Sequence, residues 1–140
     1  IVIAAEHASF GLPEARVGRL PLDGGMVLLQ RQIPYRQAMG LLLTGRRIKA
    51  QEALTMGLLN EVVPMADLDN AVQRWIDNIL ACAPLSIKAI KQVVQQTSQL
   101  SPYQAQAQRL PALVDALNSE DSEEGVRAFV EKRKPVWKGR

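Results

Sequence analysis

The chain has 140 residues, enough for one domain with one hydrophobic core. Aromatic residues make up only 4% of it, so the core is expected to be aliphatic. A single cysteine excludes an internal disulfide framework and suits a reducing compartment, so we expect a cytoplasmic protein. The net charge of +3 suits an anionic ligand but argues against nucleic-acid binding, and no apolar run reaches the ~18 residues of a membrane span.

The segments that predict strands all lie within residues 1–64. Residues 1–5 are apolar and partly β-branched, and residues 8–12 and 58–63 form further extended segments. Strands this short and this few leave their edges without enough partners inside the chain. We therefore expect residues 1–64 to be incomplete as a free-standing α/β domain.

Helical patterns alternate with these strands. The pattern from about residue 24 is helical, with Pro34 suited to a first helical turn and Gly45 placed to end the helix that follows. Residues 51–56 predict a short helix that Gly57 stops.

Residues 65–140 predict helices only. Asp67 is placed to cap a helix with one apolar face, made of Leu68, Val72, Trp75, Ile76 and Ile79. Pro84 opens the next helix, which carries an apolar stripe of Ile87, Ile90 and Val94.

Three further signals divide the last 40 residues of the chain. Ser101 with Gln104 forms a capping box with proline at the first helical position. Pro111 should break or kink the helix that follows, because an interior proline costs roughly 3 kcal/mol. Asp121 with Glu124 resembles another capping box, and this helix is expected to run to about Lys134.

The most informative motif lies near the N-terminus. The run FGLPE, residues 10–14, is followed by a loop with Gly18, Pro21, Gly24 and Gly25. The pattern resembles a segment of the crotonase (enoyl-CoA hydratase/isomerase) family. There a strand ending in F-G-x-P-E brings a glutamate to the acyl-CoA thioester, and a loop L-G-x-x-P-x-x-G-G follows.

The resemblance continues in order along nearly the whole chain. Five further runs are similar to family elements. They are LTGRRI (43–48), EA (52–53), GLLNEVV (57–63), PLSIKAIK (84–91) and a C-terminal run from SED to EKRKP (119–135). Each motif is weak by itself, and their shared order makes the resemblance specific.

The resemblance implies an α/β fold, the crotonase-like ββα spiral. The chain would cover its last short strands in residues 1–64 and the mostly helical trimerisation region, close to CoA, in residues 65–140. The family's oxyanion-hole donors, and usually a first glutamate, lie upstream of the F-G-x-P-E segment. We therefore expect this chain to be the C-terminal half of the machinery and poorly active alone.

Glu14 is the candidate catalytic residue by analogy with the family. Its proline neighbour would hold the carboxyl group rigidly, and Pro13, Leu22, Gly24 and Gly25 would form the substrate loop. From residue type alone, Glu14 could be an ordinary exposed loop glutamate, and the two glycines could form a plain tight turn.

Asp23 is a candidate second acid. In relatives that isomerise dienoyl-CoA esters or dehydrate carnitinyl-CoA, an acidic residue often directly follows the loop proline. Here Leu22 takes that place, and Asp23 is one residue later. Asp23 could equally cap the helix that begins near Met26, and the sequence favours the cap.

Other reactive residue types have no partners. His7 is expected on the surface, Cys82 is interpreted as an inert buried thiol, and one histidine with one cysteine cannot form a metal set. By the resemblance, Phe129 and Lys132 correspond to an aromatic residue and a lysine of the family that approach CoA, often from a neighbouring subunit. The alternative interpretation is that Phe129 is a core residue and Lys132 belongs to a solvated basic helix end.

The resemblance implies hydration or dehydration of a 2-enoyl-CoA thioester. CoA would be part of the substrate, with no separate cofactor. The alternatives are double-bond isomerisation, which one carboxylate can perform, and a non-catalytic CoA-binding or oligomerisation module. A homotrimer or dimer of trimers is expected, with no nucleic-acid or membrane partner.

Overall fold

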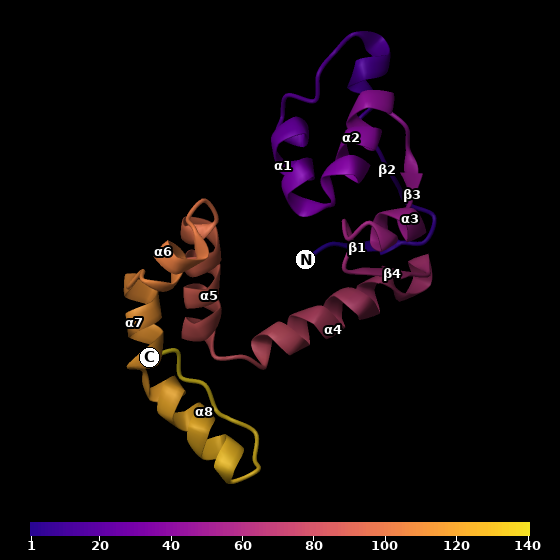
Figure 1. The fold of residues 1–140 in the computed structure, drawn as a ribbon. Helices are drawn as coiled ribbons and strands as arrows, with labels where there is room; N and C mark the ends of the chain where they lie inside the picture. The colour runs from indigo at the N-terminus through magenta and orange to yellow at the C-terminus, as the bar shows by residue number, and fades with distance from the viewer. The chain divides into compact units, whose positions relative to one another are not determined.

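The computed structural model describes residues 1–140. They form two compact units, Ile1–Trp75 and Ile76–Arg140, which Figure 1 colours from indigo to yellow along the chain. None of the helices combines the length and the hydropathy that crossing a bilayer requires.

The first unit alternates short strands and helices. Its elements are β1 (Ile3–Ala5), β2 (Ser9–Phe10), the 3₁₀ helix η1 (Pro13–Val17), α1 (Gly25–Gln32), α2 (Tyr35–Thr44), β3 (Ile48–Lys49), α3 (Ala50–Thr55), β4 (Glu61–Val63), the 3₁₀ helix η2 (Met65–Asp67) and the start of α4 (Leu68–Leu80). Gly45 ends α2 in the left-handed conformation, and Gly57 follows α3 in the same conformation, as predicted.

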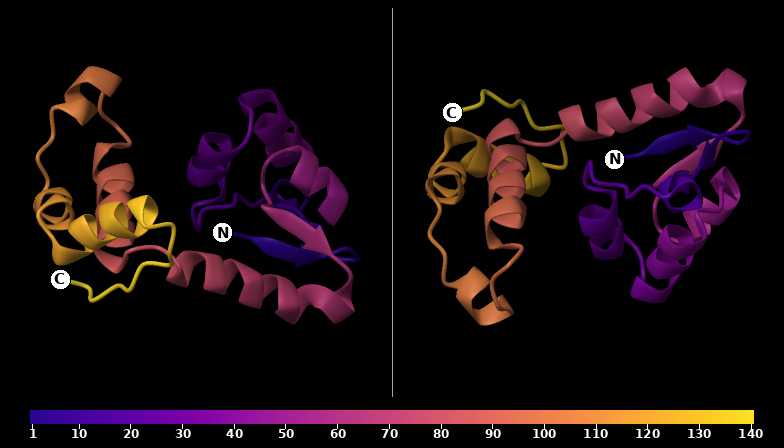
Figure 2. Two further views of the ribbon diagram at one scale, coloured as in Figure 1. Left: turned by 90° about the horizontal axis from the view of Figure 1, so that it is seen from below. Right: turned by 90° about the horizontal axis from the view of Figure 1, so that it is seen from above.

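The strands form two separate two-stranded sheets. β1 pairs in parallel with β4, with Ala4 opposite Val62, and β2 pairs antiparallel with β3, with Phe10 opposite Ile48. Figure 2 shows the β1 and β4 arrows side by side in both views. Each strand has one partner only, so every sheet in this unit has open edges, as the sequence predicts.

The core of the first unit is aliphatic, as expected from its composition. The helices and sheets bury one cluster of small and branched residues, namely Ala4, Leu29, Ile33, Ala38, Leu41, Ile48, Ala50, Ala53 and Leu59. At its rim the Glu61 carboxylate accepts hydrogen bonds from the Trp75 indole nitrogen and Arg74, which ties β4 to α4 and lowers the pKa of Glu61.

The second unit is helical. It holds the end of α4, α5 (Pro84–Thr97), α6 (Pro102–Gln106), α7 (Pro111–Leu117) and α8 (Glu120–Val130). The Ser101 capping box is present in full. Pro111 takes the first turn of the separate helix α7, so the expected break is confirmed.

Two helix boundaries differ from the prediction. Ser119 caps α8, where its Oγ accepts a hydrogen bond from Ser122 N, so the Asp121–Glu124 capping box is wrong. The helix ends at Val130 rather than near Lys134, because Lys132 adopts a left-handed conformation with φ of 54° that helix geometry does not allow.

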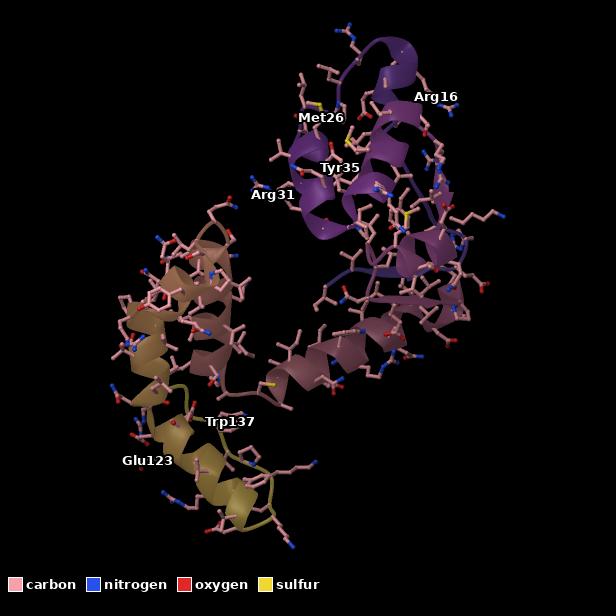
Figure 3. The ribbon with its side chains drawn as sticks, in the orientation of Figure 1. Arg16, Met26, Arg31, Tyr35, Glu123 and Trp137 are labelled. Carbon is pink, nitrogen blue, oxygen red and sulfur yellow. The ribbon has the colours of Figure 1, made fainter.

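Asp121 and Glu124 hold the C-terminal tail instead. Asp121 is 2% exposed, and its two carboxylate oxygens accept the amides of Lys138 and Gly139 at 2.7 and 2.8 Å. The Trp137 indole nitrogen donates to the Ala81 carbonyl at 2.8 Å (Figure 3). The tail is therefore fixed along α8 by side chains rather than by regular secondary structure.

Candidate active site

Glu14 lies in the first turn of η1. Pro13 starts this 3₁₀ helix and Gly18 ends it in the left-handed conformation. The Glu14 carbonyl accepts Arg19 N at 2.9 Å, which closes the turn. The rigid proline neighbour that the sequence predicted is thus built into a short ordered helix.

The side chain of Glu14 is half-buried, and its Oε2 atom is fully shielded from solvent without a hydrogen-bond partner. Burying a carboxylate oxygen without a partner is costly, and such atoms are rare in folded proteins. An ordinary exposed loop glutamate would not be placed in this way. The geometry therefore separates Glu14 from the other acidic residues of the chain.

Glu14 and Asp23 line one hollow of about 300 Å³. The remaining lining comes from the same loop and the strand end before it: Leu12, Leu20, Pro21, Leu22 and Gly25. The structure thus brings Glu14 and Asp23 together with Leu22 and Gly25 of the predicted substrate loop, whereas Pro13 and Gly24 do not line this hollow. The walls combine polar and apolar surface, and both polar side chains are acids.

Asp23 does not cap α1, so this prediction is wrong. Gly24 is the capping residue, with a φ of 93° that only glycine readily adopts, and no side chain bonds to the helix start. The Asp23 carboxylate is therefore available to the hollow. Gly25 is needed for packing, because a Cβ there would lie 2.9 Å from Pro21 Cβ.

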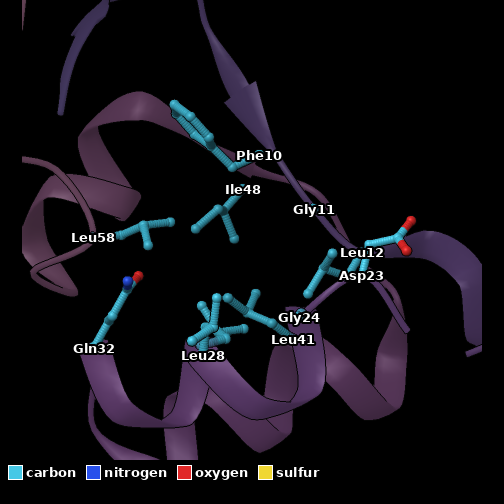
Figure 4. A pocket seen from close by; sticks show the side chains of 12 residues that line it. Phe10, Gly11, Leu12, Asp23, Gly24, Leu28, Gln32, Leu41, Ile48 and Leu58 are labelled. Atoms are coloured by element: carbon cyan, nitrogen blue, oxygen red, sulfur yellow. The ribbon is translucent and has the colours of Figure 1, made fainter. Parts of the chain in front are cut away.

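A second, apolar pocket of about 360 Å³ adjoins the hollow. Leu12, Asp23 and Gly25 line both cavities. Figure 4 shows the side chains of Leu28, Ile48 and Leu58 turned toward one another, with the Asp23 carboxylate at the far end and turned away from them. The polar hollow and the apolar pocket therefore meet at the same loop.

Three arginines near this loop, Arg16, Arg46 and Arg47, already donate hydrogen bonds to groups outside the hollow. Arg46 pairs with Glu52 through two hydrogen bonds of 3.1 and 2.5 Å, which lowers the pKa of the Glu52 carboxyl. Arg47 donates to the Ser9 hydroxyl and carbonyl oxygens. Arg16 Nε donates to the Thr44 carbonyl at 2.8 Å. The sequence did not single out Arg16, because a bond to a carbonyl 28 positions away leaves no sequence signal.

Phe129 and Lys132 lie in the second unit, at the end of α8 and just after it. Phe129 is 85% exposed, so the alternative interpretation of Phe129 as a core residue is wrong. Lys132 is also exposed. Neither lines the hollow that contains Glu14.

The other candidates play no part in a site. His7 is exposed, as predicted. Cys82 is exposed rather than buried, because it follows α4 in a turn where its thiol donates to the Asn78 carbonyl. No three His, Cys, Asp or Glu side chains are grouped to hold a metal ion.

The family model for enoyl-CoA hydratase/isomerase matches residues 1–140. The chain therefore belongs to the enoyl-CoA hydratase/isomerase family, the crotonases, and its α/β architecture is part of the crotonase fold. The resemblance found in the sequence is confirmed.

Characterised relatives and solved structures agree with this family. A carnitinyl-CoA dehydratase from Proteus mirabilis is 39% identical over 144 residues, which cover 100% of this chain and 55% of the relative. Enoyl-CoA hydratases from Bacillus anthracis and Mycobacterium tuberculosis match with TM-scores of 0.93 and 0.92 and identities of 35% and 34%. These matches cover 99% and 100% of this chain and 54% and 56% of those structures. The chain thus spans about half the length of its relatives.

Proposed function

We propose that the protein adds water to, or removes it from, a 2-enoyl-CoA thioester, with Glu14 as an acid/base. One observation carries the proposal: the Glu14 carboxylate is free of hydrogen bonds, one of its oxygens is shielded from solvent, and the residue lines a hollow of about 300 Å³. CoA is part of the substrate, and the chemistry needs no further cofactor or metal. A proton-transferring carboxylate must be free to bond with the reacting atoms, which is the state of Glu14.

Hydration needs a base, an acid and donors for an enolate oxygen. The base takes a proton from water as its oxygen attacks the β-carbon, and the acid gives a proton to the α-carbon. The thioester oxygen carries negative charge in between and needs hydrogen-bond donors. By resemblance to the family, we expect those donors in the part of the relatives that this chain does not span.

Asp23 is the candidate for the second acid/base. It lines the same hollow as Glu14, and its carboxylate makes no hydrogen bond to the N-terminus of α1. Because the relatives include carnitinyl-CoA dehydratases, a hydroxyacyl-CoA and its dehydrated product are substrates to test. Leu22 stands directly after Pro21, so the acid is displaced by one residue from its usual place in such relatives.

The CoA end of the substrate would contact Phe129 and Lys132, in line with the family pattern. Both side chains are exposed and so available to a ligand, including one bound to a neighbouring subunit of a homotrimer. An exposed aromatic ring suits stacking on adenine, and an ammonium group suits a phosphate.

The test uses the intact protein and two matched substitutions. Glu14→Gln should lower kcat for crotonyl-CoA hydration about 10²–10⁴-fold, because it removes general acid–base catalysis and keeps the side-chain shape. Asp23→Asn should lower it by a similar factor if Asp23 is the second acid. Glu6→Gln is the control, because Glu6 is exposed and does not line the hollow. Unchanged turnover in Glu14→Gln would refute the assignment and favour a non-catalytic CoA-binding or oligomerisation module.

Double-bond isomerisation is the second candidate. The observation in its favour is that Asp23 is exposed and its carboxylate turns away from the apolar pocket, which leaves Glu14 as the one shielded carboxylate at the hollow. One carboxylate suffices to move a proton between two carbons. An isomerase would convert a 3-enoyl-CoA faster than it hydrates a 2-enoyl-CoA, and Asp23→Asn would leave its kcat unchanged.

A further inference from the structure

No hydrogen bond holds the Glu14 side chain in place. Its Oε2 atom has no partner, and the carboxylate makes no ion pair. The direction of the carboxylate is therefore determined by the backbone of η1 and by the packing of that helix. Whatever fixes η1 also fixes the proposed acid/base.

A single long-range polar contact joins η1 to the rest of the unit. Arg16, two residues after Glu14, donates from Nε to the carbonyl oxygen of Thr44 at 2.8 Å. Thr44 is the last residue of α2, where carbonyl groups lack partners within the helix. An arginine there satisfies one such carbonyl and is favoured by the helix dipole.

The backbone at the end of α2 is shaped for this contact. Gly45 has a φ of 58°, and a Cβ there would lie 3.0 Å from Arg16 Cγ and 3.3 Å from Pro13 Cα. The stem of Arg16 and the start of η1 therefore pack directly on the glycine. Figure 3 places Arg16 beside this end of α2. Thr44 Oγ1 bonds to the Gly40 carbonyl and accepts Arg46 N, which orders the turn that presents the carbonyl.

We infer that Arg16 is a positioning residue for the reaction, acting through η1 on Glu14. The inference rests on the proposed function of Glu14. Arg16 does not line the hollow, so it has no direct contact with the reacting atoms. Its loss would let η1 shift relative to α2 and misplace the carboxylate.

The test measures kcat and KM in the intact protein for Arg16→Met, Arg16→Lys and the control Arg19→Met. Arg16→Met should lower kcat about tenfold to a hundredfold with little change in KM, because a displacement of about 1 Å can cost 10²-fold. Arg16→Lys should restore most of the loss, since its ammonium can donate to the same carbonyl. Arg19 has an exposed side chain without a hydrogen bond, so Arg19→Met removes the same charge and should change neither constant.

A double substitution distinguishes positioning from general destabilisation. If Arg16 acts through Glu14, Glu14→Gln/Arg16→Met should have the same kcat as Glu14→Gln alone. A further drop in the double variant, or a raised KM with unchanged kcat in Arg16→Met, would overturn the inference. If Glu14→Gln itself has no effect, the proposed function is wrong. If Glu14→Gln is impaired and Arg16→Met is not, only the inference about Arg16 is wrong.

Discussion

Lys132 occupies a position that favours glycine. It is the only residue other than glycine with a positive φ, 54°. Its amide donates to Phe129 O, and the next amide, of Arg133, donates to Ala128 O, which together close the C-terminus of α8. A left-handed conformation costs a side-chain-bearing residue about 1–2 kcal/mol, and such strain is concentrated at functional positions. The left-handed conformation closes the end of α8, and the exposed ammonium remains available to a ligand.

Replacing Lys132 by glycine should separate stability from function. We expect Lys132→Gly to raise the free energy of unfolding by about 1 kcal/mol, because it relieves the left-handed strain. The same variant should raise KM for the CoA ester, because a phosphate contact is lost. Urea denaturation and steady-state kinetics measure the two effects, and Lys134→Gly is the control for loss of charge. An unchanged KM would remove Lys132 from the CoA site.

Single residues show what the sequence could and could not predict. Glu14 was found through its motif, and Gly45 and Pro111 through backbone preferences that act locally. The sequence misassigns Asp23 and Asp121 as caps, because Gly24, the next residue, caps α1 and Ser119, two residues before Asp121, caps α8. Residue type alone cannot rank neighbouring candidates for one cap.

The C-terminal tail depends on carboxylates of α8 rather than on its own secondary structure. Glu124 accepts two hydrogen bonds from Arg133, at 2.6 and 2.9 Å, and one from the amide of Val136 at 2.9 Å. The Arg133 bonds, and then the Val136 amide, lower the pKa of Glu124 from 4.5 to about 2. These partners lie 9 and 12 positions away, too far for helix-level sequence patterns to predict.

The lowered pKa of Glu124 predicts how the tail responds to acid. A depressed carboxyl pKa adds stability that is complete above the unfolded value of 4.5 and is lost as the pH falls toward about 2. Glu124→Gln should therefore be less stable than the parent protein at pH 5 and above, and the difference should shrink between pH 4.5 and 2. Urea denaturation at several pH values measures it. Glu123→Gln, on the same helix, is the control, and a difference independent of pH would contradict the account.

At the scale of the whole molecule, each unit exposes strand edges or apolar side chains that a protein stable as a monomer would bury. In the first unit both sheets have open edges. In the second unit Ile90 and Val94 on α5 are 62% and 63% exposed, and Leu117 on α7 is 67% exposed. They line an apolar groove of about 480 Å³ between α5 and α7. The sequence predicted the stripe on α5 from its spacing, and its exposure is what an association surface requires.

We therefore expect copies of the protein to associate through α5 and α7, as a trimer by resemblance to the family. Placing a charge in the groove should prevent this, because a buried unpaired carboxylate is strongly unfavourable. Ile90→Asp should shift the intact protein toward monomer in light scattering at micromolar concentration. Gln96→Asp introduces the same charge at an exposed position of α5 outside the groove and should leave the assembly unchanged. If Phe129 and Lys132 contact CoA on a neighbouring subunit, Ile90→Asp should also raise KM. A parent protein that is monomeric, or an assembly that tolerates Ile90→Asp, would show that copies of the protein do not associate through this groove.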